Sequence, residues 1–256
     1  MEKDRRLGNR ISIVVPVYNA GNFILETIEM VRQQTYENFE LILVDDASTD
    51  NSVELIEKAA KDDNRIKLIK KASNTGAAAA RNAGISAATG RYLAFLDADD
   101  IWIKDKLEKE LAFLQEKKAA FVFTAYEFGD ENANPTGRVV YVPETLTFKQ
   151  ALSRTVIFTS TVMIDMDVVP KDKIFMPGIE SEDTATWWNI LKGGTIAYGL
   201  DEVLAIYRRP GKSLSSNKFS AIRRIWGLYR KIAGLSRIAS LFYFVGWAFR
   251  ATVRRL

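Results

Sequence analysis

Three carboxylates stand within four residues, at Asp97, Asp99 and Asp100, directly after the apolar segment 92–96. Such a segment is typical of a buried strand, and side chains at the carboxyl end of a strand in an open α/β sheet project into the ligand crevice. Carboxylates this close repel one another unless a cation or hydrogen-bond donors neutralise them. Hard oxygen ligands favour Mg²⁺ or Mn²⁺, which keeps positions open for substrate phosphates. The spacing predicts a metal-bridged diphosphate, and helix capping by Asp99 or Asp100 is the alternative.

The chain has neither His nor Cys among its 256 residues. This composition excludes imidazole bases, thiol nucleophiles, disulfides and the usual zinc sites. Any chemistry must therefore use carboxylates, Lys or Arg, hydroxyls and a metal ion. With 47% hydrophobic and 27% charged residues, the chain is expected to fold as one large α/β domain or two small ones. The first residues do not resemble a signal peptide, and we expect a cytoplasmic protein.

Apolar segments alternate with amphipathic segments through roughly the first hundred residues. Strands are predicted at 11–19, 39–44, 66–70 and 92–96, with a helix after each of the first three. This alternation implies right-handed crossovers and a mostly parallel sheet flanked by helices. Polar residues end three of these strands, at Tyr18 and Asn19, at Asp45 and Asp46, and at the acidic segment. We expect these side chains to converge on one crevice, which independent helix caps would not do.

Four motifs carry a resemblance to a known family. They are Val15–Asn19, Val44–Asp50, Ala80–Ile85 and Phe95–Asp100. In this order and spacing, the motifs resemble family 2 of the inverting nucleotide-sugar glycosyltransferases, in particular the bacterial enzymes that build teichuronic acid, capsule and other surface polysaccharides. The resemblance covers roughly residues 10–210. It implies the A-type glycosyltransferase fold, a Rossmann-like, mostly parallel sheet flanked by helices, with a nucleotide-binding half at about 10–100 and an acceptor half at about 101–218.

The resemblance implies a metal site and a nucleoside site in the first half. In that family, an Asp-x-Asp motif holds Mn²⁺ or Mg²⁺ against the donor diphosphate, and Asp97 and Asp99 match it. Asp97 is also expected at the nucleotide, and Pro16 and Tyr18 match contacts around the nucleoside. An ordinary aromatic at the end of a strand is the alternative for Tyr18.

Two further positions in this half match family contacts with the nucleotide. An acid after the second strand contacts the base, usually uracil, and Asp45 or Asp46 occupies that position. Arg81 fits a phosphate or nucleoside partner, because a guanidinium beside a ligand crevice offsets diphosphate charge. A structural ion pair with Asp45 is the alternative for Arg81. The expected donor is a UDP-sugar.

The acceptor half contains the segment Gly178–Trp188, which is similar to the Glu-Asp segment of the family. In that segment the Asp deprotonates the acceptor hydroxyl, so Asp183 is the expected base and Glu182 the second choice. Capping of the following helix is the alternative for Asp183, and the two roles are compatible. An indole of Trp187 or Trp188 is expected to support the acceptor sugar, with core packing as the alternative.

A basic loop is predicted at Arg208–Ser215. Many relatives carry a His in this region, which this chain lacks. Arg208 or Lys212 is expected to supply the positive charge over the diphosphate instead.

The C-terminal segment 219–256 is predicted to be a basic, amphipathic, helical tail separate from a catalytic domain at 1–218. After Glu202 the chain has twelve Lys and Arg residues and no acid. Twelve uncharged residues at 238–249 are fewer than the roughly 20 needed to span a bilayer. The tail is therefore expected to lie in the interface of an anionic membrane, and packing on the catalytic domain or on a second copy is the alternative.

Together with the acidic motif and the basic tail, the family resemblance implies an inverting, metal-dependent transferase that moves a hexose or related sugar from a UDP-sugar to a glycan or lipid-linked acceptor in bacterial surface polysaccharide synthesis. Its expected location is the inner face of the cell membrane, with a homo-oligomer possible. A nucleotidyltransferase is a rival, although its Gly-rich loop after the first strand is missing. A nucleic-acid-binding module is disfavoured because the acids of the crevice would repel phosphates.

Overall fold

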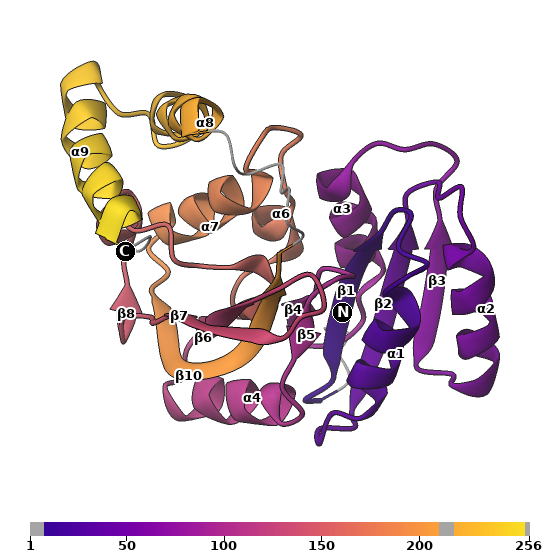
Figure 1. The fold of residues 1–256 in the computed structure, drawn as a ribbon. Helices are drawn as coiled ribbons and strands as arrows, with labels where there is room; N and C mark the ends of the chain where they lie inside the picture. The colour runs from indigo at the N-terminus through magenta and orange to yellow at the C-terminus, as the bar shows by residue number, and fades with distance from the viewer. Residues whose placement is uncertain (1–7, 210–217, 254–256) are drawn as a thin grey trace, which may run out of the picture.

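Strands and helices alternate through the first half of the chain, as the sequence predicts (Figure 1). The computed structural model describes residues 8–209 and 218–253. The elements of the first half are β1 (Ile11–Val17), α1 (Ile24–Arg32), β2 (Phe39–Asp45), α2 (Ser52–Asp62), β3 (Ile66–Lys70), α3 (Ala77–Ala87) and β4 (Tyr92–Phe95). These strands are parallel and lie in the order β3-β2-β1-β4. The predicted parallel sheet is confirmed.

The strand order creates a crevice beside β1. The chain moves from β1 to β2 and β3 on one side, and then crosses back to place β4 on the other side. Right-handed crossovers therefore put α3 on the sheet face opposite α1 and α2. Because Gly84 has no side chain, α3 approaches β1 closely, and a Cβ there would lie 2.4 Å from Val14 Cγ1. Ligands of open α/β sheets bind at such a reversal of strand order.

The second half extends the same sheet. Its elements are β5 (Ile101–Trp102), α4 (Lys106–Glu116), β6 (Phe121–Gly129), β7 (Pro135–Val140), β8 (Thr145–Leu146), α5 (Phe148–Ala151), the 3-10 helix η1 (Thr159–Thr161), β9 (Val162–Asp165), α6 (Lys171–Ile174), α7 (Glu182–Lys192) and β10 (Ala197–Arg208). The sheet continues from β4 through β9, β6 and β10 to β5. Because β9 is antiparallel to both β4 and β6, the sheet is mixed in this half.

Two helices, α8 (Lys218–Lys231) and α9 (Arg237–Val253), form the C-terminal part and lie beside α7 (Figure 1). The ring of Tyr229 on α8 stacks on Trp188 of α7 at 5.5 Å, and its hydroxyl donates to the Leu152 carbonyl at 2.6 Å. On α9, Trp247 donates from its indole to Thr155 Oγ1. The predicted helical tail therefore packs one side on the acceptor half. Within the described residues, no helix combines the length and apolar character needed to cross a membrane.

Candidate active site

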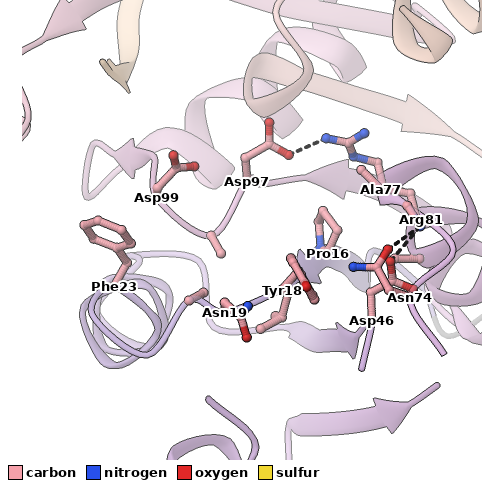
Figure 2. Close-up of a pocket in the computed structure, with 15 residues that line it drawn as sticks. Pro16, Tyr18, Asn19, Phe23, Asp46, Asn74, Ala77, Arg81, Asp97 and Asp99 are labelled. Atoms are coloured by element: carbon pink, nitrogen blue, oxygen red, sulfur yellow. Dashed lines mark hydrogen bonds and ion pairs between the residues drawn. The ribbon is translucent and has the colours of Figure 1, made fainter. Parts of the chain in front are cut away.

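A cavity of about 580 Å³ opens where the strand order reverses (Figure 2). Its lining includes six of the residues predicted for nucleotide and metal binding, Pro16, Tyr18, Asp46, Arg81, Asp97 and Asp99. They come from the ends of β1 and β2, from α3 and from the segment after β4. Figure 2 shows Asp97 and Asp99 on one side of the cavity, opposite Pro16 and Tyr18. The polar strand ends thus meet as the sequence predicts, and the volume is typical of a small-molecule site.

Asp46 is held at the cavity wall by a network of donors. Its carboxylate accepts hydrogen bonds from Lys71 Nζ at 2.6 Å, from the Gly76 amide at 2.7 Å and from the Thr75 amide at 3.1 Å. Burial alone would raise the pKa of Asp46, but these bonds outweigh it and lower the pKa. Gly76 has a φ of 89°, which a side chain would strain, so glycine is required for its amide to reach Asp46. Asp46 therefore stays ionised.

Asp45, the alternative to Asp46 for contact with the base, is not among the residues that line the cavity. It is buried and accepts a hydrogen bond from the Ser48 amide at 3.2 Å, which closes the turn after β2. Tyr18, in contrast, lines the cavity with 52% of its surface exposed. The structure thus brings Asp46 and Tyr18 to the same cavity, and Asp45 does not line it.

Arg81 joins the two halves of the molecule. Its buried guanidinium donates to Asp97 at 2.5 Å and to Glu182 at 2.9 Å (Figure 2 shows the first pair). Burial lowers the pKa of Arg81, but the charges of Asp97, Glu182 and Asp183 outweigh it and raise the pKa above its ordinary value. The alternative ion pair with Asp45 is not formed, because Arg81 points across the cavity to the segment after β4.

Asp99 and Asp100 do not cap the following helix. Helix α4 begins at Lys106, after the short strand β5. Asp100 is buried and accepts from Ser160 Oγ at 2.6 Å. Burial raises the pKa of Asp99, and the charge of Asp97 raises it further. The capping alternative is therefore wrong, and the acids repel one another at the cavity as the sequence predicts.

The carboxylates of Asp97 and Asp99 fit a divalent ion. No three His, Cys, Asp or Glu side chains gather as a complete metal site in residues 8–209 and 218–253. Mg²⁺ commonly needs only one or two carboxylates, however, because substrate phosphates and water complete its coordination. Both Asp97 and Asp99 line the cavity, and a cation there would relieve the repulsion that raises the pKa of Asp99. The donor set is hard oxygen, as Mg²⁺ and Mn²⁺ prefer.

Arg208 supports the acidic segment from β10. It is the last residue of that strand, not part of a loop, because β10 pairs with β6 as far as Arg208 and Gly129. Its guanidinium donates to the Asp99 carbonyl at 2.6 Å and to Glu26 at 2.5 Å. Arg208 therefore does not belong to the predicted basic loop, and Lys212 lies outside the described residues.

Asp183, in the first turn of α7, is linked to the acidic segment through η1. Its Oδ2 accepts from Thr159 Oγ1 at 3.2 Å. The next residue, Ser160, donates to Asp100 and accepts from the Asp97 amide at 3.1 Å. The single turn of η1 thus holds Asp183 and Asp97 together. The N-cap position of α7 belongs to Ser181.

The two tryptophans of α7 are buried. Trp187 is 1% exposed and packs against Phe95 and Phe121, with ring centroids 5.7 and 5.4 Å apart. Trp188 is 2% exposed beneath Tyr229. The expected acceptor platform on Trp187 or Trp188 is therefore wrong, because the sheet covers one indole and α8 covers the other.

Several residues around the cavity were not predicted as site residues. Phe23 and Asn74 line it, and Lys71 and Thr159 hold the acids. Asn74 and Lys71 follow β3, which is parallel to β1, β2 and β4. The expectation that parallel strands end at one edge of the sheet therefore applies to β3 as well, and it would have identified these two residues. Thr159 has no comparable sequence signal, because it reaches the site only through the packing of η1.

Comparison with known proteins assigns the class. Residues 12–167 match the model of glycosyl transferase family 2. The chain is 42% identical over 247 residues to the putative teichuronic acid biosynthesis glycosyltransferase TuaG of Bacillus subtilis, covering 96% of this chain and 97% of that protein. It is 36% identical over 236 residues to the UDP-Glc:alpha-D-GlcNAc-diphosphoundecaprenol beta-1,3-glucosyltransferase WfaP of Escherichia coli, covering 91% and 92%. The chain belongs to glycosyl transferase family 2 and is a glycosyltransferase.

Solved structures agree on the fold. Staphylococcus aureus TarS (residues 1–349) in complex with UDP-GlcNAc superposes with a TM-score of 0.71 at 19% identity, covering 93% of this chain and 71% of that one. The mannosyltransferase PcManGT of Pyrobaculum calidifontis in complex with GDP-Man and Mn²⁺ gives a TM-score of 0.69 at 21% identity, covering 89% and 65%. The predicted A-type glycosyltransferase fold is confirmed.

Proposed function

We propose that this glycosyltransferase moves a sugar from a UDP-sugar to a lipid-linked or glycan acceptor in the synthesis of a bacterial surface polysaccharide, with inversion and with a divalent metal ion. The observation that supports the proposal is that Asp46 and Asp99 line one cavity, while Asp183 is linked to the same acidic segment through Thr159 and Ser160. WfaP, by its name, uses UDP-Glc and a diphosphoundecaprenol-linked sugar, and a TarS structure contains UDP-GlcNAc. The relation to TuaG supports a polysaccharide of the cell surface.

The donor occupies the cavity beside β1 in this proposal. Asp46 accepts a hydrogen bond from the ring NH of uracil, because its pKa is lowered and its carboxylate is fixed at the wall. Pro16 and Tyr18 contact the nucleoside, and Asp97 and Asp99 hold Mg²⁺ or Mn²⁺. When bound, the ion supplies positive charge that stabilises the departing diphosphate. Arg81 orients Asp97 through their ion pair.

Asp183 accepts the proton of the attacking acceptor hydroxyl in this proposal. Its hydrogen bond from Thr159 orients one carboxylate oxygen, whereas Glu182 is engaged by Arg81. The hydroxyl oxygen forms a bond to the anomeric carbon as the bond from that carbon to the UDP oxygen breaks. One direct displacement inverts the anomeric configuration, so no glycosyl-enzyme intermediate forms.

The tail, residues 219–256, is proposed to hold the catalytic domain, residues 1–218, on the inner face of the membrane. One face of α9 is apolar and exposed, and comprises Ile238, Leu241, Phe242, Val245 and Phe249. The spacing of these residues places them along one stripe of the helix. Arg237 and Arg250 flank the stripe, so it matches an anionic bilayer surface in both polarity and charge.

The donor test is release of UDP from a panel of UDP-sugars by the full chain, with Mg²⁺, Mn²⁺ or EDTA. We expect turnover of one UDP-sugar, its loss in EDTA, and its loss in Asp99→Ala. Asp62→Ala is the matched control, because it removes an exposed acid from α2, far from the cavity. UDP release that persists in EDTA or in Asp99→Ala would contradict the metal role.

A further inference from the structure

A second cavity, of about 610 Å³, lies between α8 and the segment that precedes α7. Arg223, Arg224, Trp226 and Lys231 line it from α8, and Glu180 lines it from the opposite wall. It is separate from the donor cavity, since the two share no lining residue. None of the roles proposed above uses it.

The charges of this cavity favour an anion. Three bases, Arg223, Arg224 and Lys231, face one acid, Glu180, which leaves an excess of two positive charges. Among the residues that the structure describes, no carboxylate forms an ion pair with any of these three bases. Guanidinium groups match phosphate oxygens in geometry and charge. The cavity therefore gathers three cations that have no carboxylate partner among the described residues, and their charge favours a phosphate or diphosphate.

A short segment connects this cavity to the proposed base. Glu180 lines the cavity, Glu182 bonds Arg81 at the donor cavity, and Asp183 follows. Three residues of fully extended chain span at most about 11 Å, so Glu180 and Asp183 lie within that separation. The wall of the cavity at Glu180 is therefore joined to Asp183 by one short segment of backbone.

The cavity also borders apolar surface. Trp226 lines it and contacts Phe244 of α9 edge-on, with ring centroids 6.3 Å apart. The outer face of α9 carries exposed apolar side chains such as Phe242 and Phe249. In Figure 1, α8 and α9 lie side by side next to α7. An apolar chain attached to a bound phosphate would thus find apolar surface close by.

We propose that this cavity binds the diphosphate of a lipid-linked acceptor. The cations of Arg223, Arg224 and Lys231 hold the diphosphate, the sugar extends toward Asp183, and the lipid extends over Trp226 toward α9. This inference rests on the proposed function and deepens it, because it assigns the site that selects an acceptor on a diphosphate-linked lipid. It also gives the basic residues of α8 a role distinct from general attraction to a membrane.

The test is calorimetric titration of the full chain with farnesyl diphosphate in EDTA, which removes metal-dependent binding at the donor cavity. We expect Arg223→Gln/Arg224→Gln to weaken binding at least about tenfold, since a hydrogen bond to a charged group commonly contributes that much. Lys231→Gln, which removes the third cation of the cavity, should also weaken the binding of farnesyl diphosphate. Lys58→Gln/Lys61→Gln is the matched control, because it removes the same charge from exposed sites on α2, at the opposite edge of the sheet (Figure 1).

The comparison ligands separate the sources of binding. Farnesol should not bind, and inorganic pyrophosphate should bind more weakly than farnesyl diphosphate. Equal weakening in the α8 and α2 double variants, or wild-type affinity in the α8 double variant, would overturn the proposal. Pyrophosphate binding as tight as that of farnesyl diphosphate would overturn the lipid part.

A kinetic measurement distinguishes failure of this inference from failure of the proposed function. UDP release without acceptor should be unchanged in Arg223→Gln/Arg224→Gln, whereas KM for a sugar-diphosphate-lipid acceptor should rise. If the wild type turns over UDP-sugar but the variant keeps its acceptor KM, only the inference fails. If the wild type turns over no UDP-sugar, the proposed function itself fails.

Discussion

Arg81→Gln should destabilise the fold strongly, because this side chain bridges two carboxylates from distant segments. The Arg81 side chain is 7% exposed, and its partners Asp97 and Glu182 are 29% and 21% exposed. Removing one partner of a buried ion pair commonly lowers the free energy of unfolding by about 3–5 kcal/mol, since the remaining charge is buried without a partner. The partial exposure of both carboxylates favours the lower limit, so we expect a loss of about 3 kcal/mol in the free energy of unfolding.

Urea denaturation followed by circular dichroism measures this loss. The matched control is Lys70→Gln, which removes one positive charge from an exposed ion pair with Glu57. Exposed pairs contribute about 0–1 kcal/mol, so the control should unfold close to the wild type. A loss in Arg81→Gln no larger than that in Lys70→Gln would refute the bridging role.

Divalent ions provide a second measurement on the same variant. Without the Arg81 guanidinium, Asp97 lacks its nearest positive charge while Asp99 remains two residues away. A cation that binds only the folded state raises stability by mass action. Mg²⁺ should therefore raise the unfolding midpoint of Arg81→Gln more than that of the wild type. An equal rise in both proteins would count against the assignment of Asp97 to the metal.

Two further predictions concern residues outside the proposed chemistry. Burial alone would raise the pKa of Glu40, but hydrogen bonds from Lys67, Ser12 and Thr89 lower it from 4.5 to about 2. The ionised Glu40 therefore contributes about 3 kcal/mol to the free energy of unfolding above pH 4.5, and this contribution is lost as the pH falls toward 2. In acid denaturation, the free energy of unfolding of Glu40→Gln should depend less on pH between these two values than that of the wild type. Because the indole of Trp187 packs in the core, Trp187→Phe should lower the free energy of unfolding by about 1–2 kcal/mol in urea denaturation and leave the acceptor KM unchanged. A selective rise in the acceptor KM would instead indicate that Trp187 contacts the acceptor.

The parallel half of the fold could be predicted because its signals are local. The strand from Ile11 is apolar at nearly every position, as a strand covered on both faces must be, and polar residues mark the end of each strand. Parallel strands bring those ends to one edge, so Tyr18, Asp46 and Asp97 were expected to converge from chain order alone. Which of Asp45 and Asp46 faces the cavity depends on the turn after β2, which the pattern did not specify.

The acceptor half was harder to predict, because contacts between segments far apart in the chain decide which of its side chains are buried. Trp187 and Trp188 are adjacent on α7 and point to different surroundings, one toward the sheet and the other toward α8. A helix with an open outer face would have exposed one of them. Arg208 precedes residues typical of a loop, yet pairing with β6 keeps it in a strand. These outcomes depend on contacts between segments far apart in the chain.

The central claim is that Asp183 serves as the base at the same site that holds the donor. The most direct measurement is kcat for sugar transfer by Asp183→Asn, together with its affinity for UDP, with Asp62→Asn as control. A general base contributes about 10²–10⁴-fold, so the account predicts transfer reduced at least about hundredfold with UDP affinity unchanged. Transfer by Asp183→Asn at the wild-type rate would contradict it.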